Sequence, residues 1–295
     1  MVSVKSVSGY QYDINSLRNH GKSFYWASFF LPHQNKLAAS ELYSICRYFD
    51  DLADDSEKDL SKEIKSEYQE IVTNELNAIN KFFKKNNIKI DILGDLVKGL
   101  LKDQEKVRIN TESELIEYSY EVAGTVGLMM LPIILVNEPN ARKHAVDLGI
   151  AMQLTNIARD IYEDAKMDRL YIPKEWMGDV STKDLIDLQN SDKKKVANVL
   201  EKLIKLSDIF YKNGFSGLRY IPIKTRLGIF ISAQVYKGIG NKIKKNNYRY
   251  DLQRSYLNNY EKLWITIISI PKFFLIKYIY KNYTSVRDTF RNENL

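Results

Sequence analysis

Apolar residues recur along most of the chain at spacings of three and four, the period of an amphipathic helix. Alternating apolar and polar runs, which would indicate strands, are few. The pattern predicts long helices over residues 35–56, 59–86, 111–131, 140–163, 192–213 and 224–246. All six prolines fall outside these ranges, where helices would end or bend. We therefore expect an all-α protein, and a single domain over residues 1–295.

The predicted helix at 140–163 carries its polar residues in an unusual place. Its second half, the run LGIAMQLTNIARDI, has apolar residues on almost every side, which is typical of a helix enclosed by neighbours. The few polar residues share one narrow stripe, with spacings of three, four and four: Gln153, Asn156, Asp160 and Asp164. Because residues four apart lie one turn apart on the same face, both aspartates point into the same space. We expect this stripe to form a wall of an internal cavity.

The predicted helix at 35–56 repeats this arrangement. Its polar stripe consists of Tyr43, Arg47, Asp50 and Asp54, and a separate face of the same helix is apolar. A pair of aspartates four apart on a helix is more often ordinary solvated surface charge. Two such stripes on helices that are otherwise built for packing favour two walls of one cavity.

Four carboxylates around one cavity would repel one another, and a divalent cation would remove that cost. Magnesium takes oxygen ligands in octahedral geometry and usually keeps water and substrate phosphate oxygens as well. Zinc or redox chemistry is not indicated, because the three histidines are scattered and Cys46 is the only cysteine. We therefore predict a Mg²⁺ site between the two stripes, with Mn²⁺ as an alternative.

Basic side chains near both aspartate pairs indicate a bound anion. Arg47 precedes Asp50 by one turn, Arg159 stands beside the second pair, and Arg169 and Lys174 follow in the loop DRLYIPKEW. A planar guanidinium suits phosphate oxygens, although each arginine could instead pair with a nearby aspartate. Metal ions and arginines beside an apolar cavity would help diphosphate to leave an allylic carbon and would shelter the resulting carbocation. Ring faces could stabilise that cation, and the candidates are Tyr43, Tyr171 and Tyr236.

Five segments, in order along the chain, resemble the squalene and phytoene synthase family, and most of all its bacterial phytoene synthases: HGKSFYWASFFLP (20–32), LYSICRYFDDLADD (42–55), YSYEVAGTVGLMM (118–130), MQLTNIARDIYEDAKMDRLYIPKEW (152–176) and AQVYKGIGNKI (233–243). The resemblance implies an isoprenoid-synthase helical bundle around a central cavity. It also implies a prenyltransferase that condenses two geranylgeranyl diphosphates head to head. The product would be phytoene, formed through a cyclopropylcarbinyl diphosphate with release of diphosphate, as in carotenoid biosynthesis.

The resemblance further implies roles for individual residues. It places the metal ligands at Asp50, Asp54, Asn156, Asp160 and Asp164. It places substrate contacts at His20, Gly21, Lys22, Ser23, Tyr43, Arg47, Gln153, Arg159 and Tyr236, with Tyr171 as a further candidate. Catalytic roles fall on the four aspartates together with Tyr43 and Arg47. We expect the cavity floor, which would limit the length of the substrate, among Phe24, Phe29, Val126, Ala145 and Met152.

Other functions fit parts of the pattern. The chain could make squalene or dehydrosqualene from farnesyl diphosphate; only squalene formation needs a hydride from NADPH, so NADPH is not expected. A non-catalytic family member that serves in complex assembly would be expected to lose the aspartates, and both pairs are present. Nucleic-acid binding has only the sequence pI of 9.1 and the basic tail in its favour, and we expect no nucleic-acid partner.

The last part of the chain is both basic and apolar. Residues 237–295 contain 12 Lys and Arg against 4 Asp and Glu. We predict a helical segment over about 252–285, where WITIISIPKFFLIKYIYKNY mixes apolar and aromatic residues with lysines. Such a helix could lie on an anionic membrane surface. Alternatively, it could be the last packed helix of the bundle, with its lysines reaching water.

No segment indicates export or membrane crossing. Residues 1–20 lack the apolar core of a signal peptide, and the longest apolar run, Leu128 to Val136, is about half of the roughly 20 residues that a spanning helix needs. A single cysteine fits a reducing compartment. We expect a cytoplasmic protein with peripheral contact at the inner face of the membrane if the tail binds lipid. A desaturase is the partner that would take the product.

Overall fold

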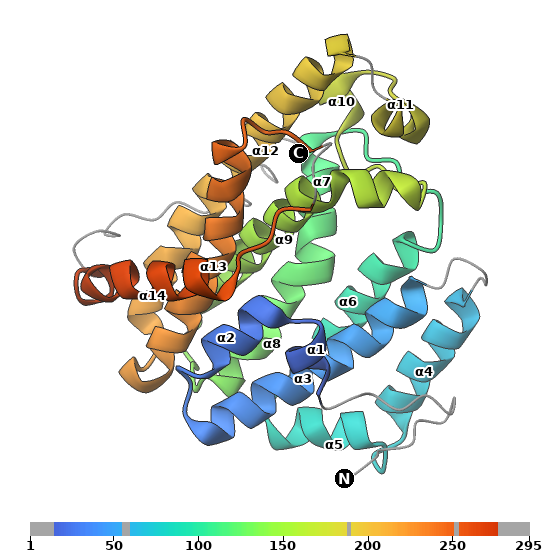
Figure 1. Ribbon diagram of the computed structural model, residues 1–295. Coiled ribbons are helices and arrows are strands. Elements are labelled where there is room, and N and C mark those ends of the chain that lie inside the picture. The colour runs from blue at the N-terminus through green and yellow to red at the C-terminus, as the bar shows by residue number, and fades with distance from the viewer. Residues whose placement is uncertain (1–14, 55–59, 188–189, 251–253, 277–295) are drawn as a thin grey trace.

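The computed structural model describes residues 15–54, 60–187, 190–250 and 254–276, and these form a bundle of helices (Figure 1). The longer helices are α3 (His33–Ala53), α4 (Ser61–Thr73), α6 (Asp91–Lys102), α9 (Ala141–Lys166), α12 (Asn190–Gly217), α13 (Ile223–Lys245) and α14 (Asn259–Phe274). The shorter ones are α1 (Ser16–Asn19), α2 (Lys22–Ser28), α5 (Ala78–Lys85), α7 (Glu112–Ser119), α8 (Thr125–Ile133), α10 (Lys174–Met177) and α11 (Thr182–Ile186). Within the described residues the nearest approach to a sheet is one isolated bridge between Arg108 and Leu170.

Four of the six predicted helices are confirmed, with ends shifted by a few residues: α3, α9, α12 and α13. The predicted helix over 111–131 is nearly continuous, but α7 passes through a π-helical turn, η1 (Tyr120–Gly124), before it becomes α8. The prediction of a single helix over 59–86 is wrong. The chain turns extended at Asn74, and the Asn77 side chain then accepts hydrogen bonds from the backbone N–H groups of Ile79 and Asn80, which starts α5 as a new helix.

Helix α6 is not predicted by the periodicity, and its two glycines explain why. Glycine weakens a helical pattern, yet each glycine here accommodates a neighbouring helix. A Cβ atom at Gly94 would lie 2.6 Å from the hydroxyl oxygen of Tyr68, and one at Gly99 would lie 2.6 Å from the Cβ atom of Glu121. Tertiary packing therefore stabilises a helix that the local sequence signals only weakly.

Helix α9 is the central element of the bundle. It packs most extensively along α12 and also contacts η1, α8 and α13. Two glycines let backbones meet: a Cβ atom at Gly127 would lie 2.2 Å from the carbonyl oxygen of Ala145, and one at Gly149 would lie 2.3 Å from that of Ala123. Helices α3 and α9, which carry the two aspartate stripes, are not among the closely packed pairs.

The predicted C-terminal helical segment corresponds in part to α14, which packs against α13. Residues 251–253 and 277–285 of that prediction lie outside the described residues. In the described part of the chain, every helix is too short or too polar to cross a membrane. The prediction of a single domain over 1–295 stays a prediction.

Candidate active site

The polar stripe of α9 lies on the accessible side of an otherwise buried helix. Gln153, Asn156, Asp160 and Asp164 are all partly accessible to solvent, whereas the other faces carry fully buried residues such as Leu154. The stripe of α3 behaves in the same way, since Tyr43, Arg47 and Asp50 are partly accessible and Phe49 is buried. In both helices, one polar residue per turn falls on the accessible side, because residues three or four apart share a face.

Asp160 is held by two arginines. The guanidinium of Arg159 donates to both carboxylate oxygens, at 2.7 and 2.5 Å, and Arg254 does the same at 2.6 and 2.8 Å. Burial opposes ionisation, but these hydrogen bonds outweigh it and lower the pKa of Asp160. Asp164 has no such compensation: burial and then repulsion from Asp160 raise its pKa to about 8. The pKa values of two carboxylates one turn apart on α9 are thus shifted in opposite directions.

The α3 stripe pairs its aspartates with arginines as well. Arg47 donates to Asp50 at 2.6 Å and contacts Asp51 at 2.5 Å, and Arg169 donates to Asp54 at 2.6 Å. Partial burial, followed by repulsion from Asp54, raises the pKa of Asp50 to about 7 despite the neighbouring arginine. Negative charge in this site is therefore only partly neutralised by the protein's own cations.

Asp103, at the end of α6, joins the two stripes and is a residue that the sequence did not point to. Its carboxylate accepts hydrogen bonds from the hydroxyls of Tyr118 (2.9 Å) and Tyr171 (2.8 Å), whose rings stack with centroids 4.9 Å apart. Burial raises the pKa of Asp103 to about 6, against the lowering effect of these hydrogen bonds. The same carboxylate raises the pKa of both Asp50 and Asp164, so it lies within electrostatic range of both stripes.

Arg169 is the second group shared by the two stripes. It binds Asp54 on the α3 side, and its positive charge lowers the pKa of Asp164 on the α9 side. It also donates to the backbone oxygen of Asp103 at 3.3 Å. Lys174, from the same loop, does not reach the site, because it pairs with Asp179 at 2.5 Å.

Aromatic rings link the predicted substrate contacts of three helices. The Phe24 ring lies 4.7 Å from that of Tyr236 on α13 and 6.2 Å from that of Tyr43 on α3. The backbone of Gly21 packs against Tyr43 so closely that a Cβ atom there would lie 2.9 Å from the ring. Tyr236 also forms a hydrogen bond with Arg159, which connects this cluster to the α9 stripe.

The remaining predicted contacts are placed less centrally. His20 and Lys22 are exposed, and Ser23 is partly accessible. Tyr171 is buried and pairs with Asp103. The expectation that Phe29 lines the cavity floor is wrong: its side chain is 60% exposed and lies under Lys36, with the ammonium 4.0 Å from the ring centroid.

Asp103 and Arg169 lie between the two aspartate helices, and proteins of known family resemble this chain over most of its length. Residues 17–261 match the sequence profile of the squalene/phytoene synthase family. The chain belongs to this family. It is 31% identical to the 15-cis-phytoene synthase of Enterobacter agglomerans, over 83% of this chain and 90% of that protein. It is 30% identical to the 4,4'-diapophytoene synthase of Staphylococcus haemolyticus, over 86% of this chain and 93% of that protein.

A solved dehydrosqualene synthase structure shares the fold of this squalene/phytoene synthase family member. The two superpose with a TM-score of 0.79 at 27% sequence identity, over 88% of this chain and 94% of the other. The predicted fold class, an isoprenoid-synthase helical bundle, is therefore confirmed.

Members of the squalene/phytoene synthase family generally use a divalent metal, and the oxygen donors here fit such an ion. The Oδ1 atom of Asn156 is buried without a hydrogen-bond partner, one turn from Asp160. Across the described ranges, no three His, Cys, Asp or Glu side chains already surround one point as they would a metal ion. Arginines occupy carboxylate oxygens of Asp50, Asp54 and Asp160 instead, so a cation would compete with them for those atoms.

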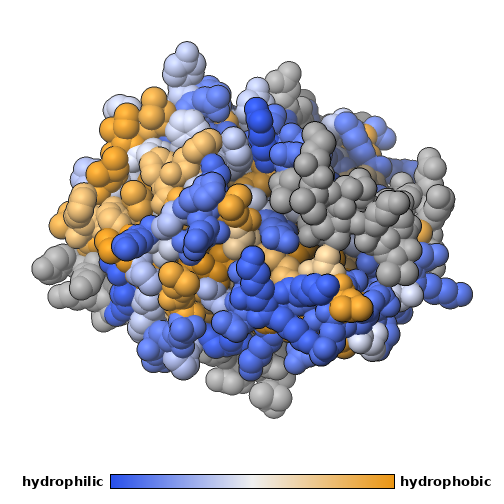
Figure 2. Space-filling model, turned by 90° about the horizontal axis from the view of Figure 1, so that it is seen from below, coloured by the Kyte–Doolittle hydropathy of each residue, from blue (hydrophilic) through white to orange (hydrophobic). Residues whose placement is uncertain are grey.

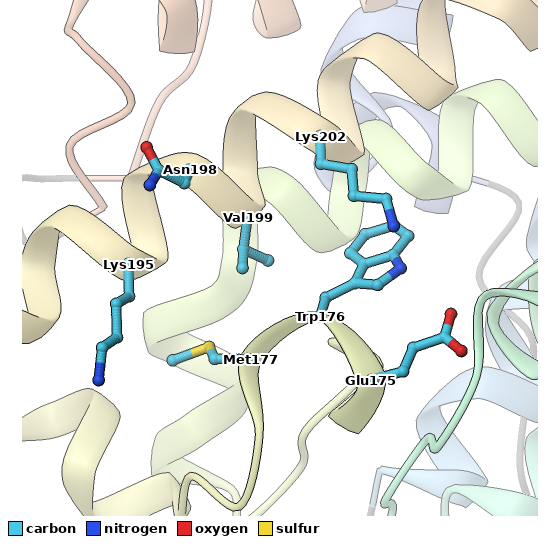
Figure 3. Close-up of a pocket in the computed structure, with 7 residues that line it drawn as sticks. All are labelled: Glu175, Trp176, Met177, Lys195, Asn198, Val199 and Lys202. Atoms are coloured by element: carbon cyan, nitrogen blue, oxygen red, sulfur yellow. The ribbon is translucent and has the colours of Figure 1, made fainter.

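A separate pocket lies between α10 and α12 (Figure 3). Its lining includes Trp176, Met177 and Val199, and the Lys202 ammonium lies 4.1 Å from the centroid of the Trp176 ring. No residue predicted for the substrate or the metal lines it. The residues predicted for substrate and metal in this family member therefore lie outside this pocket.

Proposed function

We propose that this prenyltransferase condenses two molecules of geranylgeranyl diphosphate head to head to give phytoene. In the first stage, one substrate loses diphosphate, its C1 bonds to the double bond of the second substrate, and a proton leaves to give a cyclopropylcarbinyl diphosphate. In the second stage, that intermediate loses its diphosphate, rearranges and gives up a proton to leave a conjugated triene. The observation that carries the proposal is the meeting of two aspartate stripes around Asp103 and Arg169, in a chain similar to phytoene synthases.

We propose Mg²⁺ as the cation, held by oxygen atoms of both stripes: Asp50, Asp54, Asn156, Asp160 and Asp164. When bound, the cation would neutralise charge on the departing diphosphate. Mn²⁺ would suit the same oxygen donors. The raised pKa values of Asp50 and Asp164 support this assignment, since burial and neighbouring carboxylates disfavour their charged forms and a bound cation would favour them.

Arginines of the site would hold the diphosphate itself. Arg47, Arg159, Arg169 and Arg254 converge on the aspartates from α3, α9 and two loops. A guanidinium can form two parallel hydrogen bonds to phosphate oxygens, and it stays charged throughout the reaction. These side chains would therefore orient the leaving group and remain paired with carboxylates when it departs.

The aromatic cluster would protect the reacting carbons. Tyr43, Phe24 and Tyr236 connect the arginine end of the site to the apolar interior of α2, α3 and α13. Ring faces stabilise a nearby carbocation through their quadrupoles, and their bulk excludes water that would quench it. Burial raises the pKa values of both Tyr43 and Tyr236, so their hydroxyls remain neutral.

Dehydrosqualene formation from farnesyl diphosphate is the second candidate. The similarity to a 4,4'-diapophytoene synthase and to a solved dehydrosqualene synthase favours it, whereas the similarity to several phytoene synthases favours the forty-carbon product. Both reactions would use the same aspartates and arginines, and they differ in the length of chain that the interior accepts. The transfer of the product to a desaturase stays a prediction.

The test is incubation of the purified protein and Mg²⁺ with geranylgeranyl or farnesyl diphosphate, with and without NADPH, followed by analysis of extracted hydrocarbons. We expect a forty-carbon triene from geranylgeranyl diphosphate without NADPH, and no product in excess EDTA. A larger yield of thirty-carbon triene from farnesyl diphosphate would establish the second candidate. Failure to form hydrocarbon from either substrate would overturn the proposal of an enzyme.

A further inference from the structure

The polarity of α14 is inverted relative to an ordinary surface helix. The side that packs against the protein buries Lys262, Thr266 and Ser269, each at 5% exposure or less. The outer side exposes large apolar residues, among them Trp264 at 64% and Phe274 at 74%. The outward set, called here the α14 apolar face, comprises Tyr260, Leu263, Trp264, Ile267, Ile268, Ile270, Phe274 and Leu275. Surface helices of globular proteins normally bury their apolar stripe, so an exposed apolar face of this size indicates an interaction surface.

Specific contacts fix α14 in this orientation. The Trp26 indole donates a hydrogen bond to Thr266 Oγ1 at 3.1 Å, which ties α14 to α2. Lys242 of α13 donates to Glu261 at 2.7 Å, next to the capping box at the start of α14. Ile265 packs onto Gly238 so closely that a Cβ atom there would lie 2.5 Å from the Ile265 side chain. The helix therefore cannot turn its apolar face inward without losing these contacts.

The charge around this face points to one kind of partner. Glu261, the one acidic residue of α14, is neutralised by Lys242, and Lys272 is exposed. Residues 237–295 together carry 12 basic and 4 acidic side chains. The exposed Lys272 beside this face and the basic composition of the segment complement acidic lipid headgroups, whereas two copies of the segment would bring an excess of positive charge together.

We infer that the α14 apolar face docks on a membrane that contains acidic lipids. With 16 residues α14 is shorter than the roughly 20 needed to span a bilayer, and a helix with one apolar face lies in the plane of the interface. Tyr260 and Trp264 are the ring types that settle at headgroup depth. Figure 2 shows hydrophobic side chains gathered on the left of the molecule, the side on which Figure 1 places α14. The reason for membrane docking rests on the proposed function, because a forty-carbon hydrocarbon product can leave the enzyme only into an apolar phase.

Sedimentation with lipid vesicles tests the inference without any substrate. The full-length protein is mixed with vesicles of phosphatidylcholine alone or of phosphatidylcholine with phosphatidylglycerol. We expect binding to the acidic vesicles to be at least about tenfold stronger, and to weaken as salt is added. Combined Trp264→Glu, Ile267→Glu and Phe274→Glu substitutions should reduce that binding by about tenfold or more, since each places a charge in the apolar layer.

Two further variants keep the test decisive. Leu76→Glu with Ile209→Glu changes exposed apolar residues outside α14 and should bind vesicles like the wild type. Trp264→Phe should still sediment with vesicles but lose the blue shift in tryptophan emission that wild-type protein shows on binding. Wild-type protein that stays in solution, or a triple variant that binds as well as the wild type, would overturn the inference.

The same samples separate this inference from other outcomes. If light scattering shows that the wild type self-associates and that the triple variant does not, while neither binds vesicles, the face joins two copies and the membrane assignment is wrong. Product formation from detergent-dispersed substrate is measured in parallel. Turnover by wild-type protein that does not bind vesicles would contradict the membrane inference and leave the proposed reaction standing. Vesicle binding without turnover would contradict only the proposed reaction.

Discussion

Helices α9 and α14 both carry side chains in positions that do not favour fold stability: α9 carries acidic groups in the interior, and α14 carries large apolar groups on the surface. α9 runs through the interior and carries Asp160 and Asp164, whereas α14 lies at the surface and turns Trp264 and Phe274 outward. Buried carboxylates and exposed large apolar groups each cost free energy in an isolated chain. We propose that binding partners offset this cost in both helices: a cation with diphosphate at α9, and lipid at α14.

The comparison extends to what holds each helix in place. α9 is fixed by close backbone packing at Gly127 and Gly149, so its polar stripe is free for chemistry. α14 is fixed by polar contacts on its inner side, such as that between Trp26 and Thr266, so its apolar face is free for contact with a partner. Buried polar residues on α9 and exposed apolar residues on α14 are therefore both held in place by well-packed neighbours, which is typical of functional positions.

The largest effect is expected from neutral replacements in the aspartate stripes. Asp50→Asn or Asp164→Asn should lower kcat/KM by about 1000-fold or more, because each removes a ligand from the cation and diphosphate site. Since the pKa of each carboxylate is raised in the folded protein, neither charge stabilises the metal-free fold. The unfolding midpoint in EDTA should therefore stay the same or rise.

Asp91→Asn is the matched control, because Asp91 is exposed at the start of α6, far along the chain from either stripe. It should keep wild-type turnover. Turnover by Asp50→Asn at the wild-type rate would show that the α3 stripe is structural. Asp160 is less suitable for this test, since its removal would leave Arg159 and Arg254 without their shared carboxylate.

Arg254→Gln should have the next largest effect, a loss of about 10- to 100-fold in kcat/KM. Arg254 is one of the two arginines on Asp160, and it comes from the segment between α13 and α14, so it connects α9 to the segment that leads into α14. Arg254→Lys keeps the charge without the planar fork and should retain more activity than the Gln variant. Equal activity of wild type, Gln and Lys variants in steady-state kinetics would remove Arg254 from the site.

Helical periodicity is sufficient to predict the two aspartate stripes, because two residues four apart share a face in any helix. It is not sufficient to predict Asp103 or Arg254. Asp103 reaches the site because α6 packs where Gly94 and Gly99 allow it, and Arg254 reaches Asp160 from outside a helix. Both positions depend on contacts between segments far apart in sequence, and no local pattern contains that information.

The sequence of the C-terminal segment likewise leaves its orientation open. A mixture of apolar residues and lysines fits either a membrane helix or a packed one. In the structure Lys262 faces inward, whereas Lys272, the described lysine of the segment 264–283, reaches water, so the lysines alone do not decide between the two interpretations. Which side of α14 turns inward is decided by partners on α2 and α13, such as Trp26 and Gly238, and not by the helix's own sequence.

A third prediction separates structural from functional polar residues within α9. His144 is 3% exposed, and its Nδ1 lies 2.8 Å from the carbonyl oxygen of Asn213. Burial lowers the pKa of His144 to about 4, and the positive charges of Lys143 and Arg219 add to this effect. Since the unfolded chain binds the proton more tightly, the stability contribution is complete above about pH 6.5 and is lost as the pH falls toward 4.

Denaturant titrations at pH 7 and pH 5 test this behaviour. Between these values the wild type should lose about 2 kcal/mol more unfolding free energy than His144→Asn, whose amide can still donate to the Asn213 carbonyl. Turnover by the variant at pH 7 should be close to that of the wild type. An identical pH dependence in both proteins would show that His144 is not the buried neutral group described here.

The smallest effect is expected on the inner side of α14. Lys262→Met should raise the unfolding free energy by about 1 kcal/mol, because it replaces a buried ammonium, whose pKa burial lowers, by an apolar side chain of similar length. The conservative Lys262→Arg variant should give no increase. A destabilised Lys262→Met protein in thermal unfolding would indicate that the lysine makes a favourable buried interaction and that its burial does not lower the stability of the fold.

The most direct test of the central claim is equilibrium binding of inorganic diphosphate, measured by calorimetry for the wild type, Asp50→Asn and Asp164→Asn, each with Mg²⁺ and with EDTA. If the stripes of α3 and α9 share one site, binding should require Mg²⁺, and each substitution should weaken it by about tenfold or more although the two residues lie on different helices. Binding that is equally tight in EDTA, or that survives either substitution unchanged, would contradict a shared cation and diphosphate site.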